Sequence, residues 1–218
     1  MPLPHVKTLS ELVGLIDEIG MLPFFPCPIP GFSVAEITDS RVWWTDDPEY
    51  DPWQWRIRIA SGRRIAYGKV FGGKAGFVSL NCYSDFANLR RDGYDFDALY
   101  EDGKAPHSSM CIMKLFENRN SIPSYEIKAL SGIQKGFQSA VARLQIQTYL
   151  TISGFTRRRN KRSEEYGWPI AELSPPELVF GEDIVRGAYG RSPEESLMRL
   201  EERLRPYAGC GASSLLSP

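Results

Sequence analysis

The chain has 218 residues, of which 42% are hydrophobic and 24% charged, proportions typical of a globular protein and not of a disordered one. Its net charge of -1 at pH 7 excludes a protein that binds polyanions over its whole surface. No apolar run reaches the roughly 18 residues that a membrane-spanning helix needs. The N-terminal residues lack a basic segment followed by an apolar one, so we expect no signal peptide.

Cysteine and histidine are too few and too scattered to indicate a metal site or a disulfide framework. Free cysteines in a chain without an export signal fit a reducing compartment. We therefore expect a cytoplasmic protein that needs no metal or organic cofactor. The residues concerned are Cys27, Cys82, Cys111, Cys210, His5 and His107.

The charge is unevenly distributed along the chain. Residues 1–106 have a net charge of -4, residues 107–180 of +4 and residues 181–218 of -1. A basic middle third beside acidic neighbours indicates a polyanion partner for that third alone.

The first half is expected to form a small α+β region. A helix is predicted over residues 9–19, because apolar residues recur there at helical spacing between a capping Thr8 or Ser10 and a terminating Gly20. This helix is followed by a proline-rich connector, LPFFPCPIPG, whose prolines exclude regular helix within it. Its apolar side chains are expected to pack down as an extended cover; they are Phe24, Phe25 and Ile29.

A second helix is predicted from Pro52 to about Ala60, with Asp51 as its cap. The segments RRIAYGKVF and AGFVSL are predicted to be two strands of a hairpin that turns at Gly72-Gly73-Lys74. Residues 83–91 are predicted to form a third helix. The segment RRDGYDFDALYEDG is expected to be polar, aromatic and turn-rich.

The second half has a clearer pattern. Helices are predicted over residues 108–118, from Pro123 to Gly132, and from Gly136 into LQIQ. The expected core contacts of the last two are Tyr125, Ile127, Leu130, Phe137, Ala140, Val141 and Leu144. TYLTISGFT and YGWPIAELS are predicted strands on either side of residues 157–165, RRRNKRSEE, which we call the basic tip.

Three helices followed by a two-stranded hairpin make a winged helix. We therefore predict an α+β fold in which a winged-helix domain, residues 107–181, packs on the tryptophan-rich α+β region of residues 1–106. Residues 182–218 are predicted to supply a helix that starts at Ser192, with Glu195 completing a capping box, and a frayed tail, GCGASSLLSP. The buried stripe of that helix is expected to contain Leu197, Leu200, Leu204 and Met198.

The basic tip is the clearest functional signal. Its cations are Arg157, Arg158, Arg159, Lys161 and Arg162. A hairpin tip is narrow enough to enter a minor groove or to follow a phosphate backbone, and arginine suits both. The helix predicted from Gly136, the third of the second half, would then present further side chains to the neighbouring groove, namely Gln138, Ala142, Arg143 and Gln145. The alternative is a solvated hairpin that its charge keeps soluble.

Gln145 and Gln147 are candidates for catalysis. Paired amides can hold a water molecule and stabilise an electron-poor sugar, both of which cleavage of an N-glycosidic bond requires. On a strand the two amides would point the same way, whereas on a helix they would diverge by about 200°. The alternative is that Gln145 faces solvent and that Gln147 caps the last helical turn.

Two further clusters have both a functional and a structural interpretation. The carboxylates and aromatic residues of RRDGYDFDALYEDG could line a pocket with a general acid or base, or form a polar surface turn. The tryptophans of WWTDDPEYDPWQW could stack on a base or a sugar, or belong to the core.

Four long segments carry a resemblance to a known family: WWTDDPEYDPWQWR, AYGKVFGGKAGFVS, RRDGYDFDA and LQIQTYLTISGFTRRRNKRSEEYGWPIAELSPPE. Over most of residues 8–181 the chain resembles the AlkZ-related family of bacterial proteins, distant relatives of the winged-helix DNA glycosylases that remove alkylated purines. The resemblance implies a winged-helix, DNA-associated protein. It also implies a catalytic role for Gln145 and Gln147, which match the Gln-x-Gln motif of the glycosylases.

The residues are compatible with three functions. The first is a DNA-binding winged-helix protein related to those DNA-repair glycosylases, with or without activity. The second is an active DNA glycosylase that uses Gln145 and Gln147. The third is a module for protein interaction or small-molecule binding that contacts no nucleic acid. The oligomeric state is left open by all three.

Overall fold

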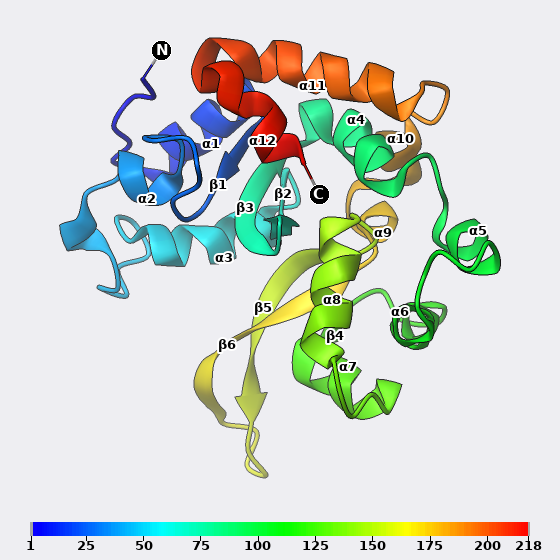
Figure 1. Ribbon diagram of the computed structural model, residues 1–218. Helices are drawn as coiled ribbons and strands as arrows, with labels where there is room; N and C mark the ends of the chain where they lie inside the picture. The colour runs from blue at the N-terminus through cyan, green and yellow to red at the C-terminus, as the bar shows by residue number, and fades with distance from the viewer. Residues whose placement is uncertain (1, 218) are drawn as a thin grey trace.

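The computed structural model describes residues 2–217 and confirms the α+β class, with helices packed around two three-stranded antiparallel sheets (Figure 1). The α-helices are α1 (Leu9–Ile19), α2 (Val34–Ile37), α3 (Pro52–Gly62), α4 (Leu80–Arg91), α5 (Phe96–Glu101), α6 (His107–Met113), α7 (Ser124–Ser131), α8 (Phe137–Ile146), α9 (Pro176–Phe180), α10 (Glu182–Arg186), α11 (Pro193–Ala208) and α12 (Ala212–Leu216). The 3₁₀ helices are η1 (Ser40–Val42), η2 (Lys114–Phe116) and η3 (Gly209–Gly211). The strands are β1 (Met21–Pro23), β2 (Ile65–Phe71), β3 (Lys74–Ser79), β4 (Ile122–Pro123), β5 (Thr151–Arg159) and β6 (Glu165–Ser174).

The first sheet lies in the N-terminal half and has the strand order β1-β3-β2. The predicted hairpin is confirmed, and Phe71 pairs with Lys74 across its turn. The predicted helices beside it are confirmed as well, with Thr8 and Asp51 as the side-chain caps of α1 and α3. The sequence does not indicate β1, because this strand contains Pro23. The fold tolerates that proline because β1 is an edge strand.

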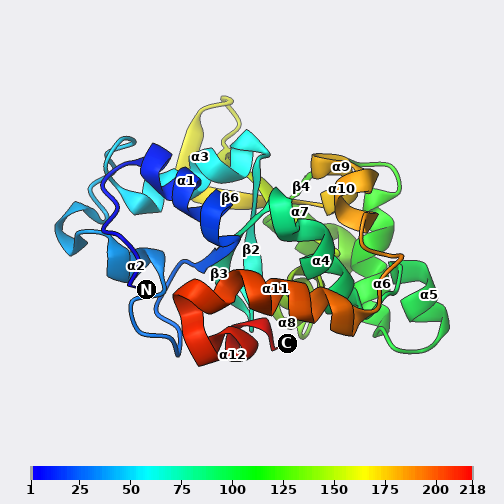
Figure 2. The ribbon, with the colours of Figure 1, turned by 90° about the horizontal axis from the view of Figure 1, so that it is seen from above.

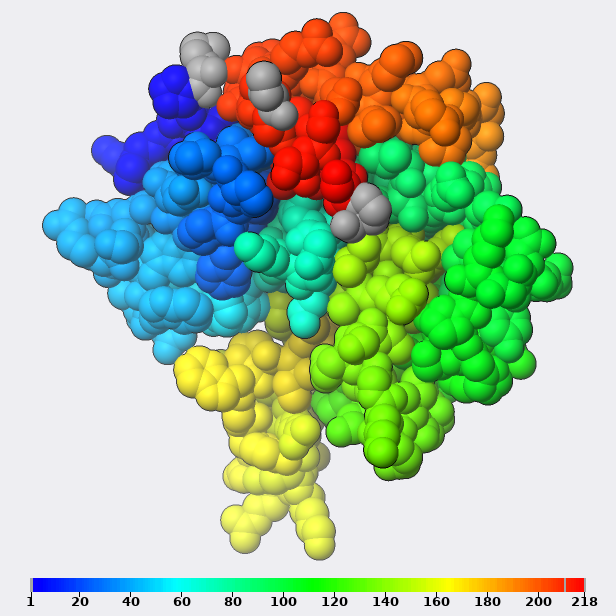
Figure 3. All heavy atoms as spheres, in the orientation of Figure 1, coloured from blue at the N-terminus to red at the C-terminus, as the bar shows by residue number. Residues whose placement is uncertain are grey.

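The second sheet has the order β4-β6-β5 and contains the second hairpin. At its inner end Thr151 pairs with Ser174, and both residues are buried. At its outer end Arg159 pairs with Glu165, and both are exposed. The outer half of hairpin β5–β6 therefore stands clear of the body of the protein, as Figures 1 and 3 show.

The inner half of hairpin β5–β6 is anchored on the first sheet. The Thr151 hydroxyl donates a hydrogen bond to the Tyr67 carbonyl on β2, 3.1 Å away. The guanidinium of Arg56 on α3 lies 3.7 Å from the ring centroid of Trp53 and 4.5 Å from that of Phe155 on β5. These contacts join α3, β2 and β5, so the exposed end of the hairpin projects from a packed base.

Helix α11 packs along α4 (Figure 2). It begins at the predicted capping box of Ser192 and Glu195 and buries Leu200 and Leu204. The prediction for Met198 is wrong, because this side chain is 63% exposed.

The prediction of a frayed tail is also wrong. The chain turns back at Gly209, which has a φ of 55°, and forms α12. Its apolar residues at positions 212, 215 and 216 are buried. A spacing of three and four positions places them on one helical face, which packs this short helix against the core.

Three further expectations need correction. The turn-rich segment contains α5, because Phe96 and Leu99 lie one helical turn apart and are both buried. Leu130 is 46% exposed, since α7 contributes Ile127 to the core from another face. Phe25 is 38% exposed, whereas its neighbour Phe24 is fully buried. No helix in the described part of the chain combines the length and the apolar character required to cross a bilayer.

Candidate nucleic-acid interface

The basic tip lies at the exposed end of hairpin β5–β6. Arg157, Arg158 and Arg159 are the last residues of β5, and Lys161 and Arg162 lie in the turn. All five side chains are exposed. The structure therefore brings together the five cations that the sequence analysis assigned to one surface.

Asn160 gives the turn a defined shape. Its side-chain oxygen accepts hydrogen bonds from the backbone N–H groups of Arg162, at 2.8 Å, and Glu164, at 3.1 Å. Its side-chain amide donates to the Glu164 carboxylate, at 2.8 Å. An asparagine that bonds to the following backbone stabilises a tight turn. The cations are thus held on an ordered turn.

Few of these cations are neutralised within the protein. Arg159 pairs with Glu165 at 3.2 Å, with both side chains more than half exposed, and a pair of this kind contributes little to stability. The guanidinium of Arg158 lies 5.2 Å from the ring centroid of Tyr125 on α7. Among the described residues, no ion pair involves Arg157, Lys161 or Arg162. The tip therefore keeps a positive charge that an anionic partner can meet.

Helix α8 presents only part of the predicted groove contact. Gln138 and Arg143 are exposed, Ala142 is half-buried, and Gln145 faces the core. Gln138 and Arg143 are five positions apart, which places their side chains about 140° apart around the helix. They consequently do not share one face of α8.

Gln145 is buried, and its amide oxygen and nitrogen each form a hydrogen bond. Strand β2 has an irregularity in its pairing between Gly68 and Phe71. The Lys69 N–H, which lies in that stretch, donates to the Gln145 side-chain oxygen at 3.0 Å, and the amide nitrogen donates to the Val141 carbonyl at 3.4 Å. The expectation that Gln145 faces solvent is wrong, since 3% of it is exposed.

Gln147 has a different environment from Gln145. It is the half-buried C-terminal cap residue of α8, and its own N–H bonds to the Arg143 carbonyl. The two glutamines follow a helical and not a strand path, so their amides diverge. Their shared role in holding one water molecule stays a prediction.

Replacing Gln145 by alanine is expected to lower the free energy of unfolding by about 1–3 kcal/mol, because a buried side chain would be lost and the partly buried Lys69 N–H would lose its acceptor. Gln147→Ala is the matched control and is expected to have a smaller effect, since that side chain is partly in solvent. Urea unfolding of both variants measures the difference. Equal effects would contradict the structural role of Gln145.

Arg91 joins the base of hairpin β5–β6 to the rest of the protein. Its side chain is 1% exposed and donates to the Glu177 carboxylate at 2.6 Å and to the Tyr189 hydroxyl at 2.9 Å. It also donates to the carbonyl of Thr148 at 2.8 Å, just before β5. Burial alone would lower the pKa of Arg91, but the charge of Glu177 outweighs this and raises it. The guanidinium therefore stays charged inside the protein.

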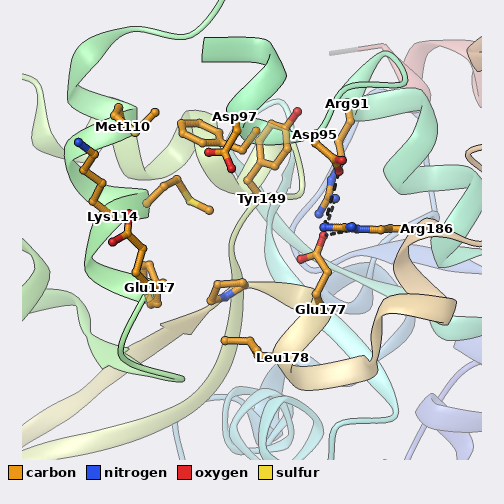
Figure 4. Close-up of a pocket in the computed structure, with 14 residues that line it drawn as sticks. Arg91, Asp95, Asp97, Met110, Lys114, Glu117, Tyr149, Glu177, Leu178 and Arg186 are labelled. Carbon is orange, nitrogen blue, oxygen red and sulfur yellow. Dashed lines mark hydrogen bonds and ion pairs between the residues drawn. The ribbon is translucent and has the colours of Figure 1, made fainter. Parts of the chain in front are cut away.

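Arg91 also lines a hollow of about 520 Å³ at the inner end of the hairpin (Figure 4). Figure 4 shows the ion pairs of Glu177 with Arg91 and Arg186 on one side, and Met110, Lys114 and Glu117 on the other. Its lining has three basic and four acidic residues, and the donors of Arg91 are already occupied. This hollow does not have the charge of a phosphate site.

Two carboxylates of the acidic and aromatic segment line the same hollow, namely those of Asp95 and Asp97. Asp95 lies 3.7 Å from Arg186 and accepts a hydrogen bond from the Tyr189 hydroxyl at 3.3 Å. Carboxylates of this segment therefore do line a hollow, and the partners of Asp95 come from α10 and the residues after it. A role for them as general acid or base stays a prediction. The sequence does not indicate those partners, because they are more than 80 residues away.

The fold and the tip define an α+β protein with a cationic hairpin that projects from a packed base. The model of the AlkZ-related family matches residues 6–214, so the chain belongs to that family, as the resemblance predicted. Membership supports a relation to the glycosylases of DNA repair. Searches of curated proteins and of solved structures gave no match.

Proposed function

We propose that this protein binds DNA through the basic tip, and that residues 107–181 act as a winged helix with hairpin β5–β6 as the wing. The order of elements supports this: α6, β4, α7 and α8 precede the hairpin, and β4 pairs with β6. A helix followed by a hairpin at its end is the arrangement that places a helix and a wing beside neighbouring grooves.

The observation that carries the proposal is the exposure of five cations on a hairpin that stands clear of the core (Figure 3). The outer half of hairpin β5–β6 contributes little to the hydrophobic core, because its side chains are exposed. Phosphate oxygens are the groups that arginine and lysine at such a position bind. Family membership points to the same polymer, because it relates the chain to DNA-repair glycosylases.

The test is the binding of the unaltered protein to a labelled DNA duplex, followed by fluorescence anisotropy across a salt series. If each of the five cations neutralises one phosphate, the slope of log K against log salt is expected to be about -4.5. A flat dependence, or no binding at low salt, would contradict the proposal.

Family membership also favours a second candidate, cleavage of an N-glycosidic bond with Gln145 and Gln147 as the catalytic pair. Its test is release of methylated purine from alkylated DNA by the unaltered protein and by Gln147→Ala, which leaves the buried amide of Gln145 in place. Release that persists in the variant would show that Gln147 is not needed for the reaction. Absence of release by both proteins would contradict the glycosylase activity.

A further inference from the structure

Hairpin β5–β6 displays a tryptophan that the core does not use. Trp168 on β6 is 77% exposed, more than any other large apolar residue in the described part of the chain. A single exposed apolar side chain is common on protein surfaces, but one that lines a hollow indicates a binding surface. No local pattern marks Trp168, because it lies in a segment that the sequence predicts to be a strand.

The backbone explains why Trp168 points outward. Thr156 pairs with Ile170 and Arg158 with Tyr166, so the single Arg157 of β5 faces three residues, 167–169, of β6. This bulge has Gly167 at a φ of 79° on one side of Trp168 and Pro169 on the other. Bulges re-aim side chains at functional sites. Here the bulge places Trp168 and Arg157 in the lining of the same hollow.

Trp168 forms one wall of a hollow of about 210 Å³, which we call the tryptophan slot. Another part of the lining comes from the N-terminal half and contains the half-buried Trp53. The ring of Trp53 is supported by Trp44, at a centroid distance of 4.3 Å, and by the guanidinium of Arg56. The slot thus has two aromatic side chains in its lining, and contacts with Trp44 and Arg56 hold one of them, Trp53, in place.

Polar groups lie at the edge of the tryptophan slot. The Gln54 amide donates to the Asp46 carboxylate at 2.9 Å, and both residues line the slot with Arg157. An aromatic hollow with an amide, a carboxylate and a guanidinium at its edge offers stacking faces together with donors and acceptors. The slot is smaller than the roughly 300–1,000 Å³ of pockets for drug-sized ligands, which suits one planar ring system.

We propose that the tryptophan slot takes one unpaired base of the DNA strand that the basic tip holds. This inference rests on the proposed function, since the cations of the tip are needed to bring phosphates beside the slot. Stacking on tryptophan accepts any base, because every base has a π-face. Arg157 belongs to both surfaces, so a nucleotide in the slot has a cation next to its phosphate.

The experiment compares the full chain on two labelled DNA duplexes that are identical except for one unpaired adenine in the second. The unaltered protein is expected to bind the second duplex about 5- to 150-fold more tightly, the range that stacking of one base gives. Trp168→Ala is expected to abolish this preference and to leave binding of the paired duplex unchanged. Trp168→Phe is expected to keep part of it.

The control is Met198→Ala, which removes an exposed apolar side chain from α11 and is expected to leave the preference intact. A second readout is the fluorescence of Trp168, taken as the difference between the unaltered protein and Trp168→Phe. The duplex with the unpaired base is expected to quench this fluorescence. Equal binding of both duplexes by the unaltered protein, or a preference that survives in Trp168→Ala, would overturn the slot alone. No binding of the paired duplex would overturn the proposed function and the slot with it.

Discussion

Changing the five cations of the basic tip to glutamine is expected to weaken binding to duplex DNA by at least about 100-fold at about 0.1 M salt, because each lost phosphate contact removes a counterion-release contribution. Fluorescence anisotropy with a labelled duplex measures the loss. The fold is expected to be unaffected, since all five side chains are exposed and the ion pair between Arg159 and Glu165 is a surface pair.

A matched control separates the position of the charges from their number. It changes five exposed basic residues outside residues 107–181 to glutamine: Lys7, Arg41, Lys74, Lys104 and Arg205. This control has the same net charge as the tip variant, so general attraction to DNA falls equally in both. Equal losses of affinity in the two variants would show that the tip is not the contact surface.

Arg91→Ala is expected to lower the free energy of unfolding by about 3–5 kcal/mol, the usual cost of removing one partner from a buried ion pair. Glu177 would keep its charge with most of its surface covered, and the Thr148 carbonyl would lose a donor. A loss of this size is a large part of the total stability of most proteins. Urea unfolding followed by circular dichroism gives the value.

Two companions of Arg91→Ala test its cause. Arg91→Lys keeps the charge but lacks the planar fork that reaches Glu177, Tyr189 and Thr148 together, so an intermediate loss is expected. Arg186→Ala removes the half-exposed cation that lies 3.9 Å from the same carboxylate and is expected to cost less than about 1 kcal/mol. A loss in Arg186→Ala as large as in Arg91→Ala would contradict the role assigned to Arg91.

Local patterns in the sequence predicted the elements that carry the tip. The apolar positions of α8, at Phe137, Ala140, Val141 and Leu144, are buried as their helical spacing indicated. Hairpin β5–β6 was predicted from two apolar segments around a polar turn. Each of these signals lies within one element, where periodicity and turn chemistry determine the structure.

Contacts between distant segments could not be predicted in this way. The burial of Gln145 depends on an unpaired N–H 76 positions earlier, at an irregularity in β2 that no local pattern marks. The tryptophan slot joins Trp53 to Trp168, and the network of Arg91 joins α4 to the segment after β6. Such pairings follow from the packing of whole elements, and a single sequence contains no direct record of them.

The proposed DNA contact is tested most directly by the difference in salt slope between the unaltered protein and the variant with all five tip cations changed to glutamine. Each phosphate contact contributes about 0.9 to the slope, so the variant's slope is predicted to be less steep by about 4. Equal slopes for the two proteins would show that the phosphates are held elsewhere and would contradict the proposal that the basic tip binds DNA.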